Sequence, residues 1–442
     1  MLRGDGGGTV YICFHGEGRK KKKDRTADPR MEGLHPDGRL KMGWTEIAGN
    51  MFKELASASE SLKDLLERCG PLTRSEPVHL ASARDRVLSG DLASPVNLPA
   101  FNRAAMDGYA VRAADTRGAT PLAPVYLEVG DEAGEGRCVP VRTGMAAPPG
   151  ADAVLMIEDA LLRGQVVEAT AEVHPYRNLA RVGEDVALGE TVLKEGHRLR
   201  PPDIALLASL GLSTVQVFAR PKVAIIPTGG ELVPLFSDQK LLPGQAREAN
   251  GLICEMYAEI WGGSPQKTSI VEDDPRLIRE AIARSLDADL ILISGGTSIG
   301  EEDYAPPIIE EMGELLVHGV RITPAKPTAL GVIDGKPVIC LPGYPVAALA
   351  ALYIFARPLI TMMAHRTDLP RTFPAKLAGK IVSRPGYLTF ARVSLKEGVA
   401  TPIMTTGAGI LSSVARAEGY VLVPEELEGR EKGEVVEVNL IE

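Results

Sequence analysis

The sequence has few aromatic residues and few cysteines, and both shortages restrict what the protein can be. Aromatic residues make up 5% of the 442 residues, whereas glycine (46) and proline (33) are plentiful. This composition favours many turns and alternating strands and helices over a helical bundle. The five cysteines lie far apart with no Cys-x-x-Cys pair, so neither a disulfide framework nor a structural zinc site is supported. A reducing cytoplasm is the expected compartment.

An excess of positive charge and a long apolar run are also missing. The net charge is −9 and the isoelectric point is about 5.5, so we expect no nucleic-acid partner, and any anionic ligand must be bound by local donors. The longest apolar run covers residues 346–356 and stops at Arg357. It is shorter than the roughly 20 residues needed to cross a bilayer, so we expect no membrane partner.

Residues 1–50 differ from the rest of the chain. They are rich in glycine, carry a lysine run at 20–23 and show no apolar period. Two interpretations stay open: a disordered basic extension, or an upstream start assignment with Met42 or Met51 as the working initiator. A secretory signal is not indicated, since the apolar core and cleavage pattern are absent.

The remaining sequence predicts a multidomain α/β plus β protein. Apolar spacing predicts helices at 52–69, 81–88 and 201–210, in a helical linker domain formed by residues 51–97 and 186–220. Short strands separated by Gly/Pro turns predict a β domain inserted at 98–185. A central doubly wound α/β/α domain is expected at 221–370, and a C-terminal β domain at 371–442.

The α/β domain alternates strands with helices. We expect strands at 223–226, 268–271, 290–294 and 338–341, and helices at 250–261, 275–285 and 346–360. Each strand is followed by a polar or glycine turn. Because carboxyl ends of parallel strands meet at one edge of a doubly wound sheet, where such sheets bind ligands, these turns should lie together.

One stretch, residues 289–304, stands out within this domain. A buried strand at Leu290–Ser294 stops at Gly295 and Gly296, which carry no Cβ and can turn backbone N–H groups toward an anion. The acidic residues 301–303 follow at once, which suits a phosphate bound together with a hard divalent cation. The simpler interpretation is a surface turn with solvated acids.

Other turns add polar groups whose simplest roles are structural. Asp274 suits the N-cap of the helix that Pro275 begins, and Asn250 suits the N-cap of an earlier helix. Asp273 is not needed for capping. Pro342 and Gly343 lead into a helix N-terminus, which can bind an anion. The Asp107–Gly108 pair is, by itself, an ordinary turn.

Six segments taken in order resemble the molybdopterin molybdenumtransferase family, which includes bacterial MoeA and the E domain of gephyrin. The resemblance covers residues 51–442, and the ordered set is specific although each piece alone is weak. The segments are Met106–Ala110, Thr143–Gly144, Gly150–Val154, Thr228–Leu232, Ser294–Tyr304 and Leu341–Pro345.

The resemblance implies a dimeric enzyme of molybdenum cofactor biosynthesis. Family members take adenylylated molybdopterin and molybdate, cleave the phosphoanhydride with Mg²⁺, release AMP and insert molybdenum. The cleft of the family lies between the α/β domain of one subunit and the β domain of the other. A molybdopterin adenylyltransferase and molybdoenzymes are possible protein partners.

The resemblance also implies site residues. Glu231, Asp273 and Asp303 would form the metal and acid set, with Lys326 as a further catalytic residue and Asp107 and Thr143 contributed by the partner's β domain. The remaining residues would bind molybdopterin or molybdate: Arg103, Gly295, Gly296, Ser298, Gly300, Pro342, Gly343, Ser412 and Ser413. Hard carboxylates for Mg²⁺ suit phosphoanhydride cleavage.

The departures from the family pattern fall on ligand loops. Asn102, Arg103 and Ala104 replace Asp-Asn-Ser, and Gly230 replaces an aspartate. Gly319 and Thr323 replace two lysines, Ala325 replaces a glycine, and Tyr344 replaces the asparagine of Leu-Pro-Gly-Asn-Pro.

These departures leave three functional hypotheses. In the first, an active transferase has rearranged its anion site, with Arg103 or Arg321 replacing lysine charge. In the second, a divergent paralogue has a changed ligand, such as tungstate, or a non-catalytic scaffold role. In the third and weakest, a nucleotide-processing enzyme shares only the α/β domain.

Overall fold

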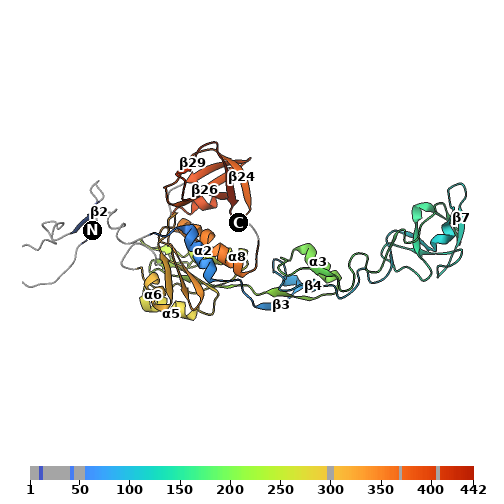
Figure 1. The fold of residues 1–442 in the computed structure, drawn as a ribbon, viewed down its shortest axis with the longest axis horizontal. Coiled ribbons are helices and arrows are strands. Elements are labelled where there is room, and N and C mark those ends of the chain that lie inside the picture. Colours follow the sequence, from blue (N-terminus) through green and yellow to red (C-terminus); the bar gives the residue numbers. More distant parts are fainter. Residues whose placement is uncertain (1–8, 13–39, 44–54, 296–302, 368–370, 405–408) are drawn as a thin grey trace, which may run out of the picture. The chain divides into compact units, whose positions relative to one another are not determined.

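A computed structural model describes residues 9–12, 40–43, 55–295, 303–367, 371–404 and 409–442. The chain forms two compact units, which contain separate sheets (Figure 1). Unit 1 consists of Met1–Leu72 and Arg220–Glu442, and unit 2 consists of Thr73–Ala219.

A six-stranded sheet lies at the centre of unit 1. Its order is β18-β15-β19-β23-β22-β20, and the strands are β15 (Lys222–Pro227), β18 (Ser264–Lys267), β19 (Leu290–Ser294), β20 (Glu314–His318), β22 (Ala329–Ile333) and β23 (Lys336–Leu341). The first four strands in this order are parallel. β22 runs antiparallel to both β23 and β20, so β20 ends at the same edge as the parallel strands.

Helices cover both faces of this sheet. They are α4 (Asn250–Ile260), α5 (Pro275–Arg284), α6 (Ala305–Met312) and a continuous helical stretch made of α7 (Pro345–Ala351), the π-helix η4 (Leu352–Ala356) and α8 (Arg357–Met363). One core joins α4 and the α7–α8 stretch to the sheet, and a second core joins α5 and α6 to it. The predicted doubly wound α/β/α arrangement is therefore confirmed.

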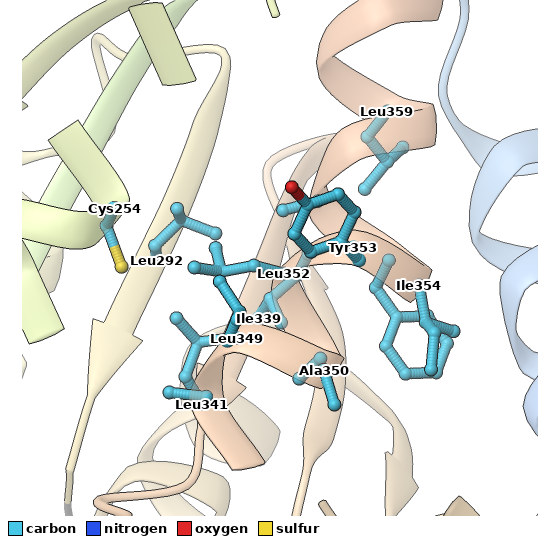
Figure 2. Close-up of a cluster of buried hydrophobic side chains, with 14 of the residues drawn as sticks. Cys254, Leu292, Ile339, Leu341, Leu349, Ala350, Leu352, Tyr353, Ile354 and Leu359 are labelled. Carbon is cyan, nitrogen blue, oxygen red and sulfur yellow. The ribbon is translucent and has the colours of Figure 1, made fainter. Parts of the chain in front are cut away.

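The helical stretch Pro345–Met363 is apolar and long enough to cross a membrane, but 78% of its most apolar window is buried inside the protein. Figure 2 shows Leu349, Leu352 and Tyr353 of this stretch in a cluster with Leu292 and Ile339 of the sheet. Its apolar surface is thus already covered by the core of unit 1.

Helix α2 (Ala58–Arg68) also belongs to unit 1. Ala58 and Leu65 are buried in the same core as the sheet, and the Arg321 side chain donates to the Leu55 carbonyl at 2.7 Å. The expected linker domain included this segment, whereas its apolar face packs in unit 1. In the first 50 residues, β1 (Thr9–Ile12) pairs with β2 (Leu40–Gly43); the rest of that expected extension lies outside the described residues.

The C-terminal part of unit 1 is a small β barrel. Its strands are β21 (Ile322–Thr323), β24 (Thr372–Leu377), β26 (Leu388–Lys396), β27 (Val399–Met404), β28 (Gly419–Val423) and β30 (Val435–Leu440). The short elements β25 (Ile381–Val382), α9 (Ser412–Ala415) and β29 (Gly429–Arg430) lie between these strands along the chain. An additional β26–β28 pairing closes the sheet. This barrel confirms the predicted C-terminal β architecture.

Unit 2 contains a six-stranded sheet of its own and three two-stranded pairs. The sheet has the order β10-β11-β7-β8-β6-β9, with β6 (Gly108–Val111), β7 (Val125–Val129), β8 (Arg137–Val141), β9 (Ala153–Met156), β10 (Ala160–Arg163) and β11 (Val166–Ala169). The pairs are β3 (Ser75–His79) with β14 (Thr214–Phe218), β4 (Leu92–Ala93) with β13 (Thr191–Leu193), and β5 (Arg103–Ala104) with β12 (Leu179–Ala180). Helix α3 (Pro201–Ser209) was predicted; the 3₁₀ turns are η1 (Leu80–Ser82), η2 (Ala113–Thr116) and η3 (Ile157–Asp159).

Two predicted elements are wrong. The helix expected at 81–88 is only the turn η1, because the backbone of Asp85 and Leu88 donates to Leu199 and His197 in a neighbouring segment. The strand expected at 268–271 is displaced to β18, four residues earlier. In both cases, pairing with a distant segment overrides the local pattern.

The expected N-cap at Asn250 is also wrong. Its side-chain amide donates instead to the Gly343 carbonyl at 2.9 Å, while Glu248 accepts from the Gly251 N–H at 2.5 Å and serves the helix start. Asn250 thereby connects α4 to the turn after β23. The N-cap at Asp274 is confirmed, since its side chain accepts from the Arg276 N–H.

Candidate functional site

The turns after β15, β18, β19 and β23 meet at one edge of the unit 1 sheet, as expected for parallel strands. The turn after β20 lies at this edge as well, because His318 pairs with Ala329, and Ala329 pairs with Cys340 near the end of β23. This edge, from here on called the ligand edge, carries the turns that contain Glu231, Asp273, Gly295, Pro342 and Gly343.

Two of the predicted acids flank one glycine turn at the ligand edge. The Gly230 N–H donates to Asp273 Oδ2 at 2.9 Å, and a Cβ built on Gly229, whose φ is +149°, would lie 2.7 Å from Glu231 Oε2. A side chain at position 230 would have room, because its Cβ would lie 3.8 Å from Asp273 Oδ2. The turn therefore ties Asp273 to the residue next to Glu231 and leaves space beside Gly230.

Gly295 joins three strands at this edge. It has a φ of +105°, and a Cβ there would lie 2.2 Å from the Thr228 carbonyl oxygen, so only glycine fits. Its N–H donates to the Leu341 carbonyl. The Gly229 N–H likewise donates to the Val271 carbonyl. The expectation that the Gly295 N–H turns outward toward an anion is wrong, because the neighbouring strand accepts it.

Asp303 is held in a half-buried pair at the end of β20. Its Oδ2 lies 3.1 Å from His318 Nε2, and its side chain is 14% exposed. Its other carboxylate oxygen, Oδ1, is buried and accepts no hydrogen bond from any residue that the structure describes. Burial raises the pKa of Asp303 above its usual value, and the hydrogen bond and charge of His318 oppose part of that rise. A buried oxygen without a partner costs about 1–3 kcal/mol, which makes Oδ1 a candidate ligand atom.

The remaining unit 1 candidates are placed as follows. Pro342 and Gly343 form the turn that leads into α7, and Lys326 is half-buried in the loop after β21. Ser412 is exposed at the start of α9, whereas Ser413 is buried and its hydroxyl donates to the Ile410 carbonyl. Ser413 therefore has a structural role. The predicted positions Gly296, Ser298 and Gly300, with Glu301 and Glu302, lie outside the described residues.

Unit 2 gathers its own three candidates around one turn. Asp107 Oδ1 accepts from the Thr143 N–H at 2.7 Å and from the Thr143 hydroxyl at 2.8 Å. These two bonds lower the pKa of Asp107, the backbone bond first. Arg103 is exposed on β5, and backbone bonds join the next residue, Ala104, to the Thr143–Met145 turn. The exposed guanidinium and the ionised carboxylate thus belong to one local surface.

Two residues change the sequence-based interpretation. Arg321, one of the two suggested replacements for lost lysine charge, is held by the Leu55 carbonyl and lies 3.6 Å from Glu425. These contacts tie the Arg321 side chain to packing within unit 1, whereas Arg103 is exposed on β5. His318 was not identified from the sequence, which placed it in the middle of a strand expected at 315–322, whereas β20 ends at His318.

Three segments of the chain match family descriptions. Residues 56–211 match the MoeA N-terminal region (domains I and II), residues 224–362 match a probable molybdopterin binding domain, and residues 374–441 match the MoeA C-terminal region (domain IV). A Methanocaldococcus jannaschii protein named for molybdopterin biosynthesis is 37% identical over 373 residues, which cover 82% of this chain and 92% of that protein. The molybdopterin molybdenumtransferase 2 of Mycobacterium tuberculosis is 33% identical over 384 residues, covering 82% and 93%.

The chain belongs to the MoeA family of molybdopterin molybdenumtransferases.

A solved structure agrees with this assignment. The molybdopterin biosynthesis MoeA protein of Pyrococcus horikoshii superimposes with a TM-score of 0.76 at 33% identity, over 88% of this chain and 99% of that one. The MoeA fold therefore accounts for the α/β sheet, the C-terminal barrel and the β-rich unit 2, and it identifies the protein as an enzyme of that family.

Proposed function

We propose that this MoeA-family enzyme takes adenylylated molybdopterin and molybdate, cleaves the phosphoanhydride with Mg²⁺, releases AMP and yields the molybdenum cofactor. The observation that carries the proposal is the glycine turn at the ligand edge, where the Gly230 N–H donates to Asp273 Oδ2 and the next residue along the chain is Glu231. Phosphoanhydride cleavage depends on neutralising and positioning phosphate charge more than on covalent help. Carboxylates from two segments at one turn suit that chemistry.

The residues present fit Mg²⁺ only together with substrate. Within the part of the chain that the structure describes, no three His, Cys, Asp or Glu side chains gather around one point. Mg²⁺ is usually bound through one or two carboxylates plus substrate phosphates and water, and Glu231 and Asp273 match that requirement. The orphaned Oδ1 of Asp303 offers a third oxygen at the same edge. Bound Mg²⁺ would neutralise charge on the phosphates.

Other groups of the protein would supply positive charge for the phosphates and orient the side chains of the site. The helical stretch that begins at Pro345 has its N-terminus at the ligand edge, where a helix start offers N–H groups and partial positive charge to an anion, and we propose that Lys326 adds positive charge to the site. In unit 2, Thr143 keeps Asp107 ionised and oriented. We propose that unit 2 of a partner subunit completes the site in a homodimer, and that the enzyme works in the cytoplasm, receiving substrate from an adenylyltransferase and passing product to molybdoenzymes.

The proposal is tested by AMP release from adenylylated molybdopterin by the purified full-length chain. Release should require molybdate and Mg²⁺ together, and the product should activate an apo-molybdoenzyme. Tungstate is tested in parallel, because the substituted loops are compatible with a changed oxyanion. Binding of the substrate without AMP release under any oxyanion would contradict the enzymatic proposal and favour a scaffold role.

Arg103→Ala should raise the molybdate concentration for half-maximal AMP release by about 10-fold or more, because a guanidinium forms charge-assisted hydrogen bonds with an oxyanion. Arg117→Ala, at another exposed arginine of unit 2, is the matched control and should leave the titration unchanged. An unchanged molybdate titration in Arg103→Ala would remove Arg103 from the site.

A further inference from the structure

Tyr344 is exposed at the ligand edge, between the Pro342–Gly343 turn and the start of α7. Its side chain is 66% exposed, although large aromatic side chains usually gain stability by burial. The position is also the N-cap of the helical stretch, and the tyrosine side chain makes no cap hydrogen bond there. An asparagine, which the family motif has at this position, is among the best N-cap residues. Tyr344 therefore contributes neither burial nor capping.

The tyrosine ring is nevertheless held in place on one side. A Cβ built on Gly409 would lie 3.3 Å from Tyr344 Cδ1 and 3.6 Å from its Cε1. Because Gly409 has no side chain, the ring lies against the backbone of the segment that leads into α9. The next residues, Ile410 and Leu411, are 39% and 37% exposed. The ring and this segment form a continuous, partly apolar surface next to the helix N-terminus.

We infer that Tyr344 is a stacking platform for the planar pterin ring of the substrate. This inference rests on the proposed function, since it assumes a molybdopterin ligand at the ligand edge. A flat aromatic face accepts a planar heterocycle by stacking, which needs no exact hydrogen-bond match. Tyr344 neither caps the helix nor is buried, and a role in binding the pterin ring accounts for an aromatic residue at this position.

The test measures the binding of metal-free molybdopterin to the full-length protein by anaerobic fluorescence titration. Tyr344→Ala should weaken binding by about 10-fold or more, the range found for aromatic stacking on a base. Tyr344→Phe keeps the ring and should bind as the wild type does. Tyr344→Asn should show both expected effects at once: a higher melting temperature, because the N-cap is restored, and the same loss of binding as Tyr344→Ala.

Phe373→Ala is the control, because Phe373 is a 44% exposed aromatic residue on β24 of the barrel. It should leave molybdopterin binding unchanged. Unchanged binding in Tyr344→Ala, with normal binding by the wild type, would overturn the stacking role while leaving the proposed function intact. Absence of molybdopterin binding by the wild type would overturn both. Loss of binding in Tyr344→Phe would overturn the stacking role and assign the effect to the hydroxyl.

Discussion

Asp303→Asn should lower the rate of AMP release by about 10²–10³-fold, the usual cost of removing one preorganised electrostatic group from an active site, while leaving the fold intact. Asparagine has the same shape as aspartate and can still accept a hydrogen bond from His318 Nε2, which lies 3.1 Å from Asp303 Oδ2. What disappears is the negative charge at the buried Oδ1.

The same substitution should leave the protein equally stable or make it more stable. Burial raises the pKa of Asp303, so the ionised carboxylate destabilises the folded state. For an acid whose folded-state pKa is raised, the stabilising contribution is complete below the unfolded pKa, near 3.8, and is lost as pH rises through the folded pKa. The stability advantage of Asp303→Asn should therefore grow as pH rises through that range, as measured by chemical denaturation.

Asp334→Asn provides the control for this experiment. Asp334 lies in the turn between β22 and β23, at the opposite edge of the sheet, with a φ of +48°, a conformation that asparagine also adopts readily. Neither activity nor stability should change by much. AMP release at the wild-type rate in Asp303→Asn would show that Oδ1 has no part in the reaction.

Much of the ligand edge could be predicted because it depends on local patterns. The apolar run 290–294, bounded by Asp289 and Gly295, gave the observed limits of β19. Parallel strands then place the turns after them at one edge whatever the details of packing. The same reasoning identified Asp273 as an acid that α5 does not need, and Asp274 as its cap.

The rest could not be predicted because it depends on contacts between distant segments. Nothing in the spacing of Asp303 and His318 indicates that they pair across the sheet edge. The N–H of Gly295 is taken by Leu341 of a neighbouring strand, which a single strand's pattern cannot reveal. β22 is a different case, since the Asp334–Gly335 pair between two apolar runs is a local hairpin signal that predicts the β22–β23 turn.

Asp273→Asn should raise the Mg²⁺ concentration for half-maximal activity by about 10–100-fold, a range typical of disturbed metal sites, and should lower the maximal rate. The asparagine carbonyl can still accept the Gly230 N–H that Asp273 Oδ2 accepts at 2.9 Å, so the Gly229–Gly230 turn and the position of Glu231 should persist. The lost group is the second carboxylate oxygen with its charge, which is the part that a hard cation requires.

The adjacent Asp274 provides a matched control for this experiment. Asp274→Asn removes the same charge one residue away and keeps a competent N-cap, because asparagine caps helices as well as aspartate does and can accept from the Arg276 N–H as Asp274 does. If general negative potential at the sheet edge attracts Mg²⁺, the two variants should shift the Mg²⁺ titration equally. If Asp273 is a ligand, only Asp273→Asn should shift it. Equal titrations for both variants and the wild type would exclude Asp273 from the metal site and leave Glu231 and Asp303 as the acids to test.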